Sequence, residues 1–304
     1  MSTAEQVTER SDWLNTSALS ISAEAYHKLP GISNSKLSVF IDDPREYWYQ
    51  FLSGMYVEKQ RDHFDFGAAV HDICLLNDLD GIAVVPQFEL DAKNVTKQGK
   101  QSTSKATTYY QDSLSDFETA NYGKTLLSHD DYMNVLRCVD AVRKHPIAGE
   151  LLSSPGYTER CYAWESAEHG FALRCRPDKL CSWNNKNIVV DLKTTTDTVA
   201  SRFVRSIDKF GYARQEAFYR KVLAANSIEV DAFVFIAVKD SPPHCVDCYT
   251  IRGDWLESAA SEVDSALLEL ARRTRDNDWE SATANSVVEL APPNWLKYKG
   301  DYSL

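Results

Sequence analysis

The sequence predicts an α/β (α+β) protein with a central mixed β-sheet flanked by helices and with a largely helical N-terminal half. The first observation is that apolar residues before residue 146 recur three or four positions apart, the spacing of helices with one buried face. The second is that several runs after Tyr157 alternate or are fully apolar and are bounded by turn residues, which is typical of strands. Helical segments separate these strands, and such a mixture builds helix layers around a sheet.

The N-terminal half begins with a polar lead-in over residues 1–30, which contains a short apolar element at 18–29. Ser33 and Asn34 can cap the free N–H groups at the start of a helix. We predict helices over 33–43, 47–52, 66–76 and 130–145. Residues 88–123 are polar and are expected to be a partly ordered excursion, either a mobile loop or a solvated helix. Four lysines are interleaved in it: Lys93, Lys97, Lys100 and Lys105.

The C-terminal half is predicted to hold the strands. They span residues 157–165, 171–180, 187–194, 231–239 and 245–251. Glu168-His169-Gly170 is the expected turn between the first two strands, and Asn184-Asn185 leads into the third. Further helices are predicted over 203–207, 212–225 and 253–275. The last 30 residues, with Pro292-Pro293-Asn294-Trp295, are expected to wrap the surface, so that residues 31–304 form a single domain.

The chain has 304 residues with 33 Lys and Arg against 44 Asp and Glu, which gives a formal net charge of −11. Its 43% hydrophobic and 25% charged residues are ordinary for a globular protein and argue against wholesale disorder. No apolar run approaches the ~20 residues of a membrane span, and the N-terminus carries no apolar signal segment. A cytoplasmic protein without a membrane partner is therefore expected. The seven cysteines are odd in number and scattered, so reduced thiols are expected.

The acidic balance at first argues against a nucleic-acid partner, because phosphate binding usually depends on an excess of Lys and Arg. The charge is uneven, however. Residues 171–221 hold eleven basic and five acidic residues, net +6, whereas 253–304 hold five basic and ten acidic residues, net −5. A focused positive cleft can hold DNA on an acidic protein, with the acidic C-terminal face turned away. Arg174, Arg176 and Arg214 are then candidate DNA contacts, and the alternative is a chance cluster of solvated charges.

Asp178, Asp191 and Lys193 are the candidate catalytic residues. Alternate side chains of a strand share a face, so Asp191 and Lys193 point the same way. The tight Asn184-Asn185 turn is expected to place Asp178 near Asp191. Two carboxylates at a sheet edge form a hard oxygen site for Mg²⁺ or Mn²⁺, and an adjacent lysine can orient or deprotonate a water and stabilise charge on a phosphate. The alternative is a surface strand with a solvated Asp–Lys pair.

Five motifs in order along the chain resemble those of a known nuclease family. They are Gly31-Ile32-Ser33-Asn34-Ser35-Lys36-Leu37, Phe66-Gly67-Ala68-Ala69-Val70-His71, Cys175-Arg176-Pro177-Asp178-Lys179, Val190-Asp191-Leu192-Lys193-Thr194-Thr195 and Tyr212–Tyr219. Pro177-Asp178 followed by Asp191-Leu192-Lys193 matches the PD-(D/E)XK nuclease signature. The whole series, from about Gly31 to Trp295, resembles the C-terminal nuclease domain of RecE-type exonucleases (exonuclease VIII). An isolated Asp-x-Lys is a weak signal, whereas five motifs in order are a strong one.

The resemblance implies a role for each matching residue. The metal ligands would be His71, Asp178, Asp191 and the carbonyl of Leu192. Lys193 would be the catalytic lysine. Gln215 and Tyr219 are four residues apart on one helix face and match a Gln-x-x-x-Tyr pair that supports the site. Glu159 matches an acidic position common in these folds.

Simpler roles remain open for several of these residues. His71 could be a satisfied core residue of an apolar helix, and Gln215 and Tyr219 could belong to an ordinary amphipathic helix. Glu159 is either a supporting group or a solvent-facing strand residue. Ser33 and Ser35 could hold a terminal 5′-phosphate, although N-capping is the more expected role. Cys245 and Cys248 could be half of a metal site, but packing in the core is the more expected role.

The resemblance implies a Mg²⁺-dependent exodeoxyribonuclease, with Mn²⁺ as the alternative ion. It would degrade one strand of double-stranded DNA from its ends, 5′→3′, and leave 3′ single-stranded tails for recombination. It also implies a homo-oligomeric ring, a trimer or tetramer, and cooperation with a single-strand annealing protein in phage-type recombination. The alternatives are a structure- or sequence-specific endonuclease of the same fold and a catalytically silent DNA-end-binding protein. The chain has no G-x-x-x-x-G-K-[ST] motif of the kind found in helicases.

Overall fold

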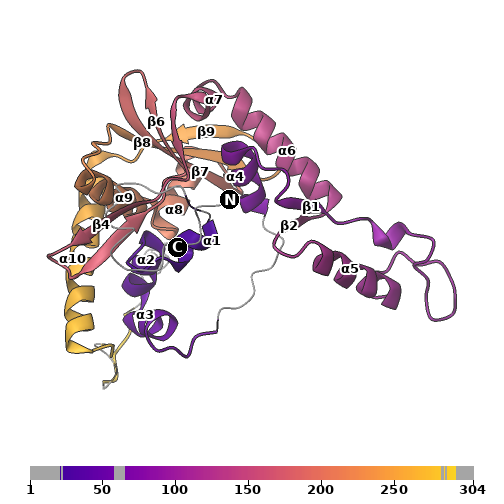
Figure 1. Cartoon of the computed structure of the whole chain (residues 1–304), viewed down its shortest axis with the longest axis horizontal. Coiled ribbons are helices and arrows are strands. Elements are labelled where there is room, and N and C mark those ends of the chain that lie inside the picture. Colours follow the sequence, from indigo (N-terminus) through magenta and orange to yellow (C-terminus); the bar gives the residue numbers. More distant parts are fainter. Residues whose placement is uncertain (1–20, 22, 58–65, 282–283, 285, 292–304) are drawn as a thin grey trace, which may run out of the picture.

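The computed structural model describes residues 21, 23–57, 66–281, 284 and 286–291. Its largest sheet has five strands in the order β3-β6-β7-β8-β9. These strands are β3 (Gly156–Thr158), β6 (Lys179–Trp183), β7 (Lys186–Thr195), β8 (Ala232–Lys239) and β9 (Val246–Tyr249). β7 and β8 run parallel and the other neighbours run antiparallel, so the sheet is mixed. Helices cover both of its faces (Figure 1), which confirms the predicted fold class.

The turn between β6 and β7 sets the register at the centre of the sheet. Both residues of Asn184-Asn185 have positive φ, 51° and 59°. This is the conformation of a two-residue type I′ hairpin turn, which asparagine adopts more readily than most residues. The antiparallel ladder that starts at this turn ends with Lys179 opposite Val190. The next position in this register places Asp178 across from Asp191.

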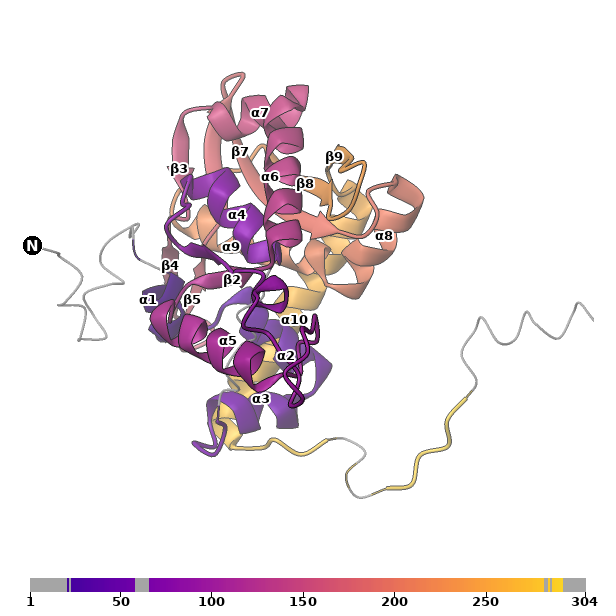
Figure 2. The ribbon, with the colours of Figure 1, turned by 90° about the vertical axis from the view of Figure 1, so that its right-hand side faces the viewer.

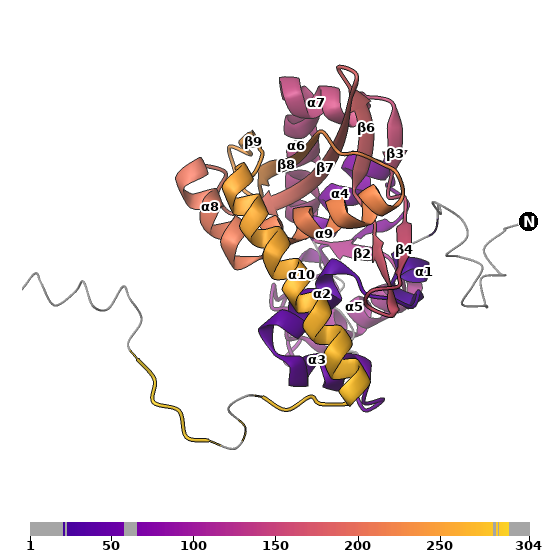
Figure 3. The ribbon, with the colours of Figure 1, turned by 90° about the vertical axis from the view of Figure 1, so that its left-hand side faces the viewer.

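Two apolar clusters lie on the two faces of the sheet. The first is covered by α2 (Asn34–Asp42), α8 (Ala200–Lys209), α9 (Tyr212–Ala225) and α10 (Gly253–Asp276), which face the viewer in Figure 3. The second is covered by α4 (Phe66–Leu76), α6 (His129–Lys144) and α7 (Pro146–Ser153), which face the viewer in Figure 2. Along β8, Phe233 and Phe235 face the first cluster, and Val234 and Ile236 face the second. The strand is apolar from Ala232 to Val238, as expected for a strand whose two faces are both covered.

Helices α2 and α3 (Pro44–Phe51) each begin directly after a residue whose side chain caps the free N–H groups of the first turn. The Ser33 hydroxyl accepts a hydrogen bond of 3.4 Å from the N–H of Lys36 at the start of α2, as expected for an N-cap. Asp43 caps α3 in the same way, and Pro44 fits the first turn because its missing N–H would have no helical partner there. α1 (Ala23–Lys28) falls within the predicted lead-in, but residues 1–20 and 22 lie outside the described part of the chain.

Two predicted strands are each divided in the structure. The expected strand 157–165 is split into β3 and β4 (Tyr162–Ser166), and the expected strand 171–180 is split into β5 (Phe171–Cys175) and β6. At the breaks, Glu159 has a φ of 55° and Pro177 has no N–H to donate to a ladder. β4 and β5 therefore form a separate two-stranded hairpin. The N–H of Glu159 donates to the carbonyl oxygen of Asp178 at 3.0 Å, so the two breaks lie side by side.

Residues 85–124 leave the body of the protein between two short parallel strands, β1 (Ile82–Val84) and β2 (Thr125–Leu127), and are called the arm below (Figures 1 and 2). The arm contains a short 3-10 helix, η2 (Phe88–Leu90), and α5 (Thr108–Ala120). This agrees with the expected partly ordered excursion. β1, β2 and α7 were not predicted. A three-residue strand has too little periodicity to be seen in a sequence, and α7 begins at Pro146, directly after the end of the predicted helix 130–145.

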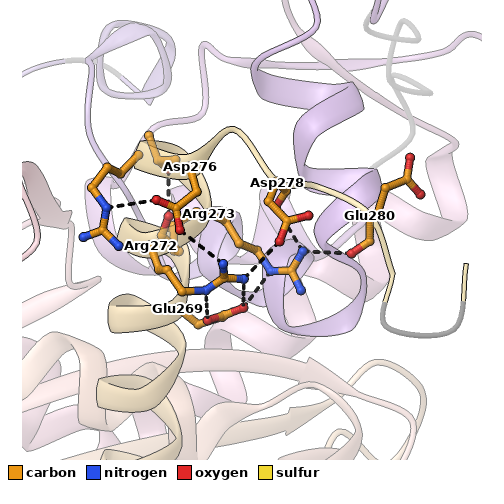
Figure 4. A network of polar contacts seen from close by, with 9 residues as sticks. Glu269, Arg272, Arg273, Asp276, Asp278 and Glu280 are labelled. Atoms are coloured by element: carbon orange, nitrogen blue, oxygen red, sulfur yellow. Dashed lines mark hydrogen bonds and ion pairs between the residues drawn. The ribbon is translucent and has the colours of Figure 1, made fainter.

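Charged side chains at the C-terminal end of α10 form a network of hydrogen bonds and ion pairs (Figure 4). The carboxylate of Glu269 accepts hydrogen bonds from Arg272 and Arg273 at 2.8 Å. The chain then turns so that the Trp279 ring stacks on Tyr47 of α3, with 5.7 Å between the ring centroids. The start of the C-terminal segment is thus packed on α3, as the prediction of a surface-wrapping tail requires.

The rest of that segment departs from the prediction. Val287 and Leu290 are almost fully exposed, so residues 286–291 do not pack on the surface. Pro292-Pro293-Asn294-Trp295 lies outside the described residues. The prediction was wrong for 286–291 because an apolar composition does not by itself provide a surface to pack against.

All seven cysteines are free, as expected. Cys248 is half-buried beside the second apolar cluster, but Cys245 is exposed just before the edge strand β9. The prediction of core packing is therefore wrong for Cys245, since an edge strand has an open side. Within the described residues, no helix is long and apolar enough to cross a membrane.

Candidate active site

Asp178 and Asp191 meet at the end of the β6–β7 ladder. The Oδ2 atom of Asp178 accepts a hydrogen bond of 2.8 Å from the backbone N–H of Leu192, which holds this carboxylate against β7. Asp191 is 2% exposed and lies on the face of β7 that contacts α9. The structure thus places the two carboxylates beside each other, as the Asn184-Asn185 turn predicts, and Leu192 contributes its N–H to the site.

His71 of α4 completes a group with two carboxylates. Its Nε2 atom lies 3.1 Å from Oε1 of Glu159 and 3.1 Å from Oδ1 of Asp178. The ligand atoms of these three residues all lie within 4.8 Å of one another. On its other side, Nδ1 of His71 lies 3.4 Å from Oδ1 of Asp72. One imidazole nitrogen with two carboxylates is a donor set that suits a divalent cation.

This group shares His71 and Asp178 with the predicted ligand set and differs from it in the other members. Glu159 is the third member of the group, whereas Asp191 faces Lys193, and metal binding by Asp191 and by the carbonyl of Leu192 stays a prediction. The side chain of Glu159 is 9% exposed, so it is not a solvent-facing strand residue. Sequence reasoning missed its position because the break in the strand at Glu159 depends on the neighbouring break at Pro177. The contact from Asp72, the residue after His71, was also missed.

A second group consists of Lys193, Asp191 and Gln215. Nζ of Lys193 lies 2.5 Å from Oδ1 of Asp191 and donates a hydrogen bond of 3.2 Å to Oε1 of Gln215. The amide nitrogen of Gln215 in turn donates to Oδ2 of Asp191. Gln215 therefore bridges the lysine and the carboxylate, and it orients both of them.

Two tyrosines of α9 lie around this second group. Tyr219 is one turn after Gln215 on the same face of α9, and its hydroxyl donates a long hydrogen bond of 3.5 Å to the carbonyl of Arg176. The Tyr212 ring lies below Lys193, with Nζ 4.7 Å from the ring centroid, which favours the positively charged amine. The face of α9 that was predicted to support the site does contact it.

A pocket of about 330 Å³ adjoins both groups. It is lined by Gly67, Ala68, His71, Leu192, Lys193, Thr194 and Tyr212. Gly67 and Ala68 have little or no side chain, which leaves room between the start of α4 and the end of β7. A substrate group in this pocket would therefore contact the residues of both groups.

Comparison with known proteins agrees with this geometry. Residues 35–283 match the family described as "PDDEXK-like domain of unknown function (DUF3799)". The chain belongs to this family. In structure it is similar to a Eubacterium rectale protein named "Putative exonuclease", with a TM-score of 0.53 and 14% sequence identity over 92% of this chain and 98% of that chain. At this identity the similarity shows the fold alone. No curated protein matches the chain in sequence.

The electrostatics of the PDDEXK-like site favour a positive charge on His71. Burial disfavours the imidazolium, but the charge of Asp178 and hydrogen bonds to Asp178 and Asp72 outweigh it and raise the pKa of His71 to about 10. Burial acts to raise the pKa of Asp178, but His71 and Lys193 lower it below its usual range. The protonated imidazole thus offsets the carboxylates, and a cation bound by all three residues has to displace its proton.

The charges of Asp191 and Lys193 depend on each other. Burial, together with the like charge of Asp178, raises the pKa of Asp191 to about 6, although Lys193 acts against this. Burial acts to lower the pKa of Lys193, but the two aspartates outweigh it and raise that pKa above its usual range. Near neutral pH, Lys193 is therefore an ammonium group beside an ionised carboxylate.

Two of the three arginines predicted to bind DNA form ion pairs within the protein. Arg176 pairs with Glu159 and donates to its backbone carbonyl at 3.2 Å. Arg214 of α9 places Nη1 3.0 Å from Oε1 of Glu262 on α10. The count of charges by segment therefore overstates the free positive charge at these two arginines, and an acidic C-terminal face turned away from DNA stays a prediction. α10 packs directly on α9, so its acidic residues neutralise part of the positive segment.

Arg174 is a different case. It is 1% exposed, its guanidinium lies 4.3 Å from the ring centroid of Tyr26, and its Nε and Nη1 atoms have no hydrogen-bond partner among the described residues. Burial, with a smaller effect of Arg174, lowers the pKa of Lys36 on α2 to about 8. Ser33 is the N-cap of the same helix, and Ser35 is exposed in its first turn.

Proposed function

We propose that this PDDEXK-like protein is a divalent-metal-dependent exodeoxyribonuclease that degrades one strand of double-stranded DNA from its ends. The ion is Mg²⁺, with Mn²⁺ as the alternative, and the direction is 5′→3′, which leaves 3′ single-stranded tails for recombination. The observation that carries the proposal is the meeting of two groups at one end of the sheet: His71, Glu159 and Asp178, and Lys193 with Asp191.

The first group fits a divalent cation. Two carboxylates and an imidazole nitrogen lie within 4.8 Å of one another. The two carboxylates favour the protonated, positively charged imidazole, and the same negative charge would attract a metal cation. The nitrogen donor makes the group more favourable to Mn²⁺ than an all-oxygen site would be. A cation held by His71, Glu159 and Asp178 would polarise the scissile phosphate and lower the pKa of a bound water.

Lys193 supplies a fixed positive charge next to that group. Because its ammonium is held by Asp191 and Gln215, it needs no rearrangement to orient a water or to offset the negative charge that develops on a phosphate in the adjoining pocket. As an ammonium, it acts as a hydrogen-bond donor and not as a base. Asp191 thus acts through Lys193, and Gln215 positions both.

Recognition of a 5′ end is supported by the surroundings of Arg174 at the start of α2. Arg174 and Lys36 are neighbouring cations, and neither forms an ion pair within the described part of the chain. Two such charges need an anion, and the N-terminus of a helix also favours one. We assign the terminal 5′-phosphate to this place, with the first turn of α2 at Ser33 and Ser35 as its other contact. Tyr26 covers the Arg174 guanidinium, so access to it depends on α1.

The assembly that we propose is a homo-oligomeric ring, a trimer or tetramer, that works with a single-strand annealing protein. This part rests on the resemblance of the five sequence motifs to RecE-type exonucleases. A ring also explains how an acidic protomer stays on DNA, because encirclement replaces part of the electrostatic attraction. Light scattering of the purified protein, with and without linear duplex, measures the number of subunits.

The test is a cleavage assay with linear duplex DNA labelled at its 5′ or 3′ end, and with closed circular DNA, in Mg²⁺, Mn²⁺ or EDTA. We expect progressive loss from the 5′ ends of the linear duplex, no cutting of the circle, and no activity in EDTA. Lys193→Met is expected to reduce the rate by at least about 100-fold. Lys186→Met, an exposed lysine on the same strand, is the matched control and keeps the wild-type rate.

Three outcomes would overturn parts of this proposal. Cutting of the closed circle would identify an endonuclease. Binding of DNA ends without cleavage in either ion would identify a silent end-binding protein. Wild-type activity of Lys193→Met would mean that the catalytic group lies elsewhere.

A further inference from the structure

We infer that the loop of the arm, residues 91–107, binds the phosphate backbone of duplex DNA outside the active site. The inference rests on the proposed function, because it assigns a second contact to the same substrate. Residues 92–111 contain no acidic residue and four lysines, in a chain with a net charge of −11. The four are Lys93, Lys97, Lys100 and Lys105, and all are exposed.

Most of this positive charge is unpaired. Neither Lys97 nor Lys100 forms an ion pair with any residue that the structure describes. Lys105 is 66% exposed and lies 3.9 Å from Glu89, near the limit of an ion pair. Asp91 at the start of the loop accepts a hydrogen bond of 2.7 Å from the Tyr109 hydroxyl, and its pKa is lowered, so it keeps its charge. The loop as a whole therefore carries a net charge of +3.

The loop has a defined shape although it lacks regular structure. The side chain of Asn94 is fully buried, and its amide nitrogen donates to the carbonyls of Glu89, Ser102 and Ser104 at 3.2, 2.8 and 3.3 Å. The N–H of Thr96 donates to the carbonyl of Lys100 at 2.8 Å. The lysines at the tip are thus presented on a preformed turn, which reduces the conformational entropy that is lost on binding.

Aromatic contacts hold η2, which directly precedes the loop, against α5, which follows it. Phe88 contacts Tyr110 and Phe117 edge to face, with 6.4 and 6.3 Å between the ring centroids. These rings form a small apolar core within the arm. The loop and α5 therefore behave as one unit, and the lysines keep their positions relative to that helix.

The arm is joined to the part of the protein that carries the site. β2, at its base, packs against α4, the helix of His71, and against α6. From there the arm projects away from the sheet (Figure 1). α5 has 13 residues, so it is about 20 Å long, which corresponds to roughly six base pairs of duplex. A duplex with its end at His71 would therefore have backbone within reach of the arm.

The composition of the loop favours duplex DNA over other partners. Residues 93–107 contain no aromatic residue on which the bases of a single strand could stack, and Val95 is their only large apolar residue. A protein partner would need an apolar centre in the interface, which this surface does not offer. Lysines with Ser, Thr and Gln fit a partner that is recognised by charge and hydrogen bonds, which the DNA backbone is.

The test measures the affinity for a duplex of about 30 base pairs by fluorescence anisotropy at several salt concentrations, with Ca²⁺ in place of Mg²⁺. The arm variant replaces Lys93, Lys97, Lys100 and Lys105 by Gln. The matched control replaces four exposed cations elsewhere by Gln: Lys144, Lys186, Arg252 and Arg275. Each lost phosphate contact lowers the slope of log K against log salt by about 0.9, so we expect a decrease of up to about 3.6 in the arm variant and little change in the control.

Two results would overturn the inference. One is an arm variant with the wild-type slope and affinity. The other is a loss that appears only with a single strand of the same length, which would assign the arm to the product and not to the duplex. Failure of the proposed function looks different, because the wild-type protein would then not degrade the linear duplex from its ends with Mg²⁺, whatever the affinity of the arm variant.

Discussion

The proton on His71 should compete directly with the metal ion. The imidazole is held between the carboxylates of Glu159 and Asp178, and its pKa is raised to about 10. At neutral pH, in the absence of a metal ion, the imidazole of His71 is therefore protonated. A divalent cation that uses Nε2 of His71 has to release this proton, so its apparent affinity has to rise with pH.

The size of the effect follows from the pKa. Below about pH 10, each pH unit changes the free energy of metal binding by about 1.4 kcal/mol, a factor of ten in affinity. Between pH 6.5 and 8.5 the apparent dissociation constant for Mn²⁺ should thus fall by about 100-fold. This window lies above the pKa of Asp191, about 6, so the charge of that group changes little within it.

Isothermal titration calorimetry provides the assay. Mn²⁺ is titrated into metal-free protein at three pH values, each in two buffers of different ionisation enthalpy, which counts the protons released. We expect close to one proton for each ion in the wild type. His71→Asn removes the titrating group and should abolish both the release and the pH dependence. His129→Asn, an exposed histidine at the start of α6, is the control and should behave as the wild type.

A pH-independent affinity without proton release in the wild type would refute this reasoning. It would mean that the ion binds without His71, for example on the carboxylates alone. If His129→Asn also abolished the pH dependence of Mn²⁺ binding, that dependence would arise from the overall charge of the protein and not from the proton on His71.

Four further outcomes are expected. Gln215→Ala should lower kcat by about 10- to 100-fold with little change in KM, because Lys193 and Asp191 lose their shared partner. Tyr219→Phe removes only one long hydrogen bond from the same helix face and should change kcat less than about threefold, and the reverse ranking would contradict the geometry. Asn94→Ala removes buried hydrogen bonds that stabilise the loop by about 2 kcal/mol. It should leave the Tm of the protein nearly unchanged but increase the rate of tryptic cleavage of the arm by about 30-fold. Equal cleavage rates of the variant and the wild type would contradict the ordered loop. The metal-free protein should lose stability as pH rises from 6.5 through about 10, because His71 stabilises the fold only while its imidazole is protonated. Denaturant titrations should show a decrease in the free energy of unfolding of at most about 5 kcal/mol. His71→Asn should make the free energy of unfolding nearly independent of pH in this range.

The features that were predicted correctly from the sequence depend on short stretches of chain. The start of α2 is set by the Ser33 cap. The start of α3 was predicted three residues too late, at Tyr47, although Asp43 and Pro44 are local start signals. The juxtaposition of Asp178 and Asp191 needs only a two-residue turn and an alternating strand pair. In each case a few neighbouring residues select one backbone conformation, so the pattern is visible without the rest of the fold.

The charges of the site depended on packing between distant segments. The count of charges by segment suggested a positive face, but it carried no information on which segment packs against which. Glu262 neutralises Arg214 from 48 residues further along the chain, because α10 lies on α9. Arg174 is enclosed beneath Tyr26, which is 148 residues before it. The arm lysines, in contrast, lie on an exposed loop, and Lys97 and Lys100 form no ion pair with any residue that the structure describes.

The sequence by itself determined the mixed sheet, the register of its central hairpin and the juxtaposition of Asp178 and Asp191, while the catalytic role of Asp178, Asp191 and Lys193 stays a prediction. Only the tertiary structure decided that Glu159, and not Asp191, completes the group with His71 and Asp178. That choice depends on two strand breaks that lie side by side, at Glu159 and Pro177, and on a helix from the other face of the sheet. Local patterns select backbone conformations, whereas a site of this kind is made of contacts between elements that meet only when the core is packed.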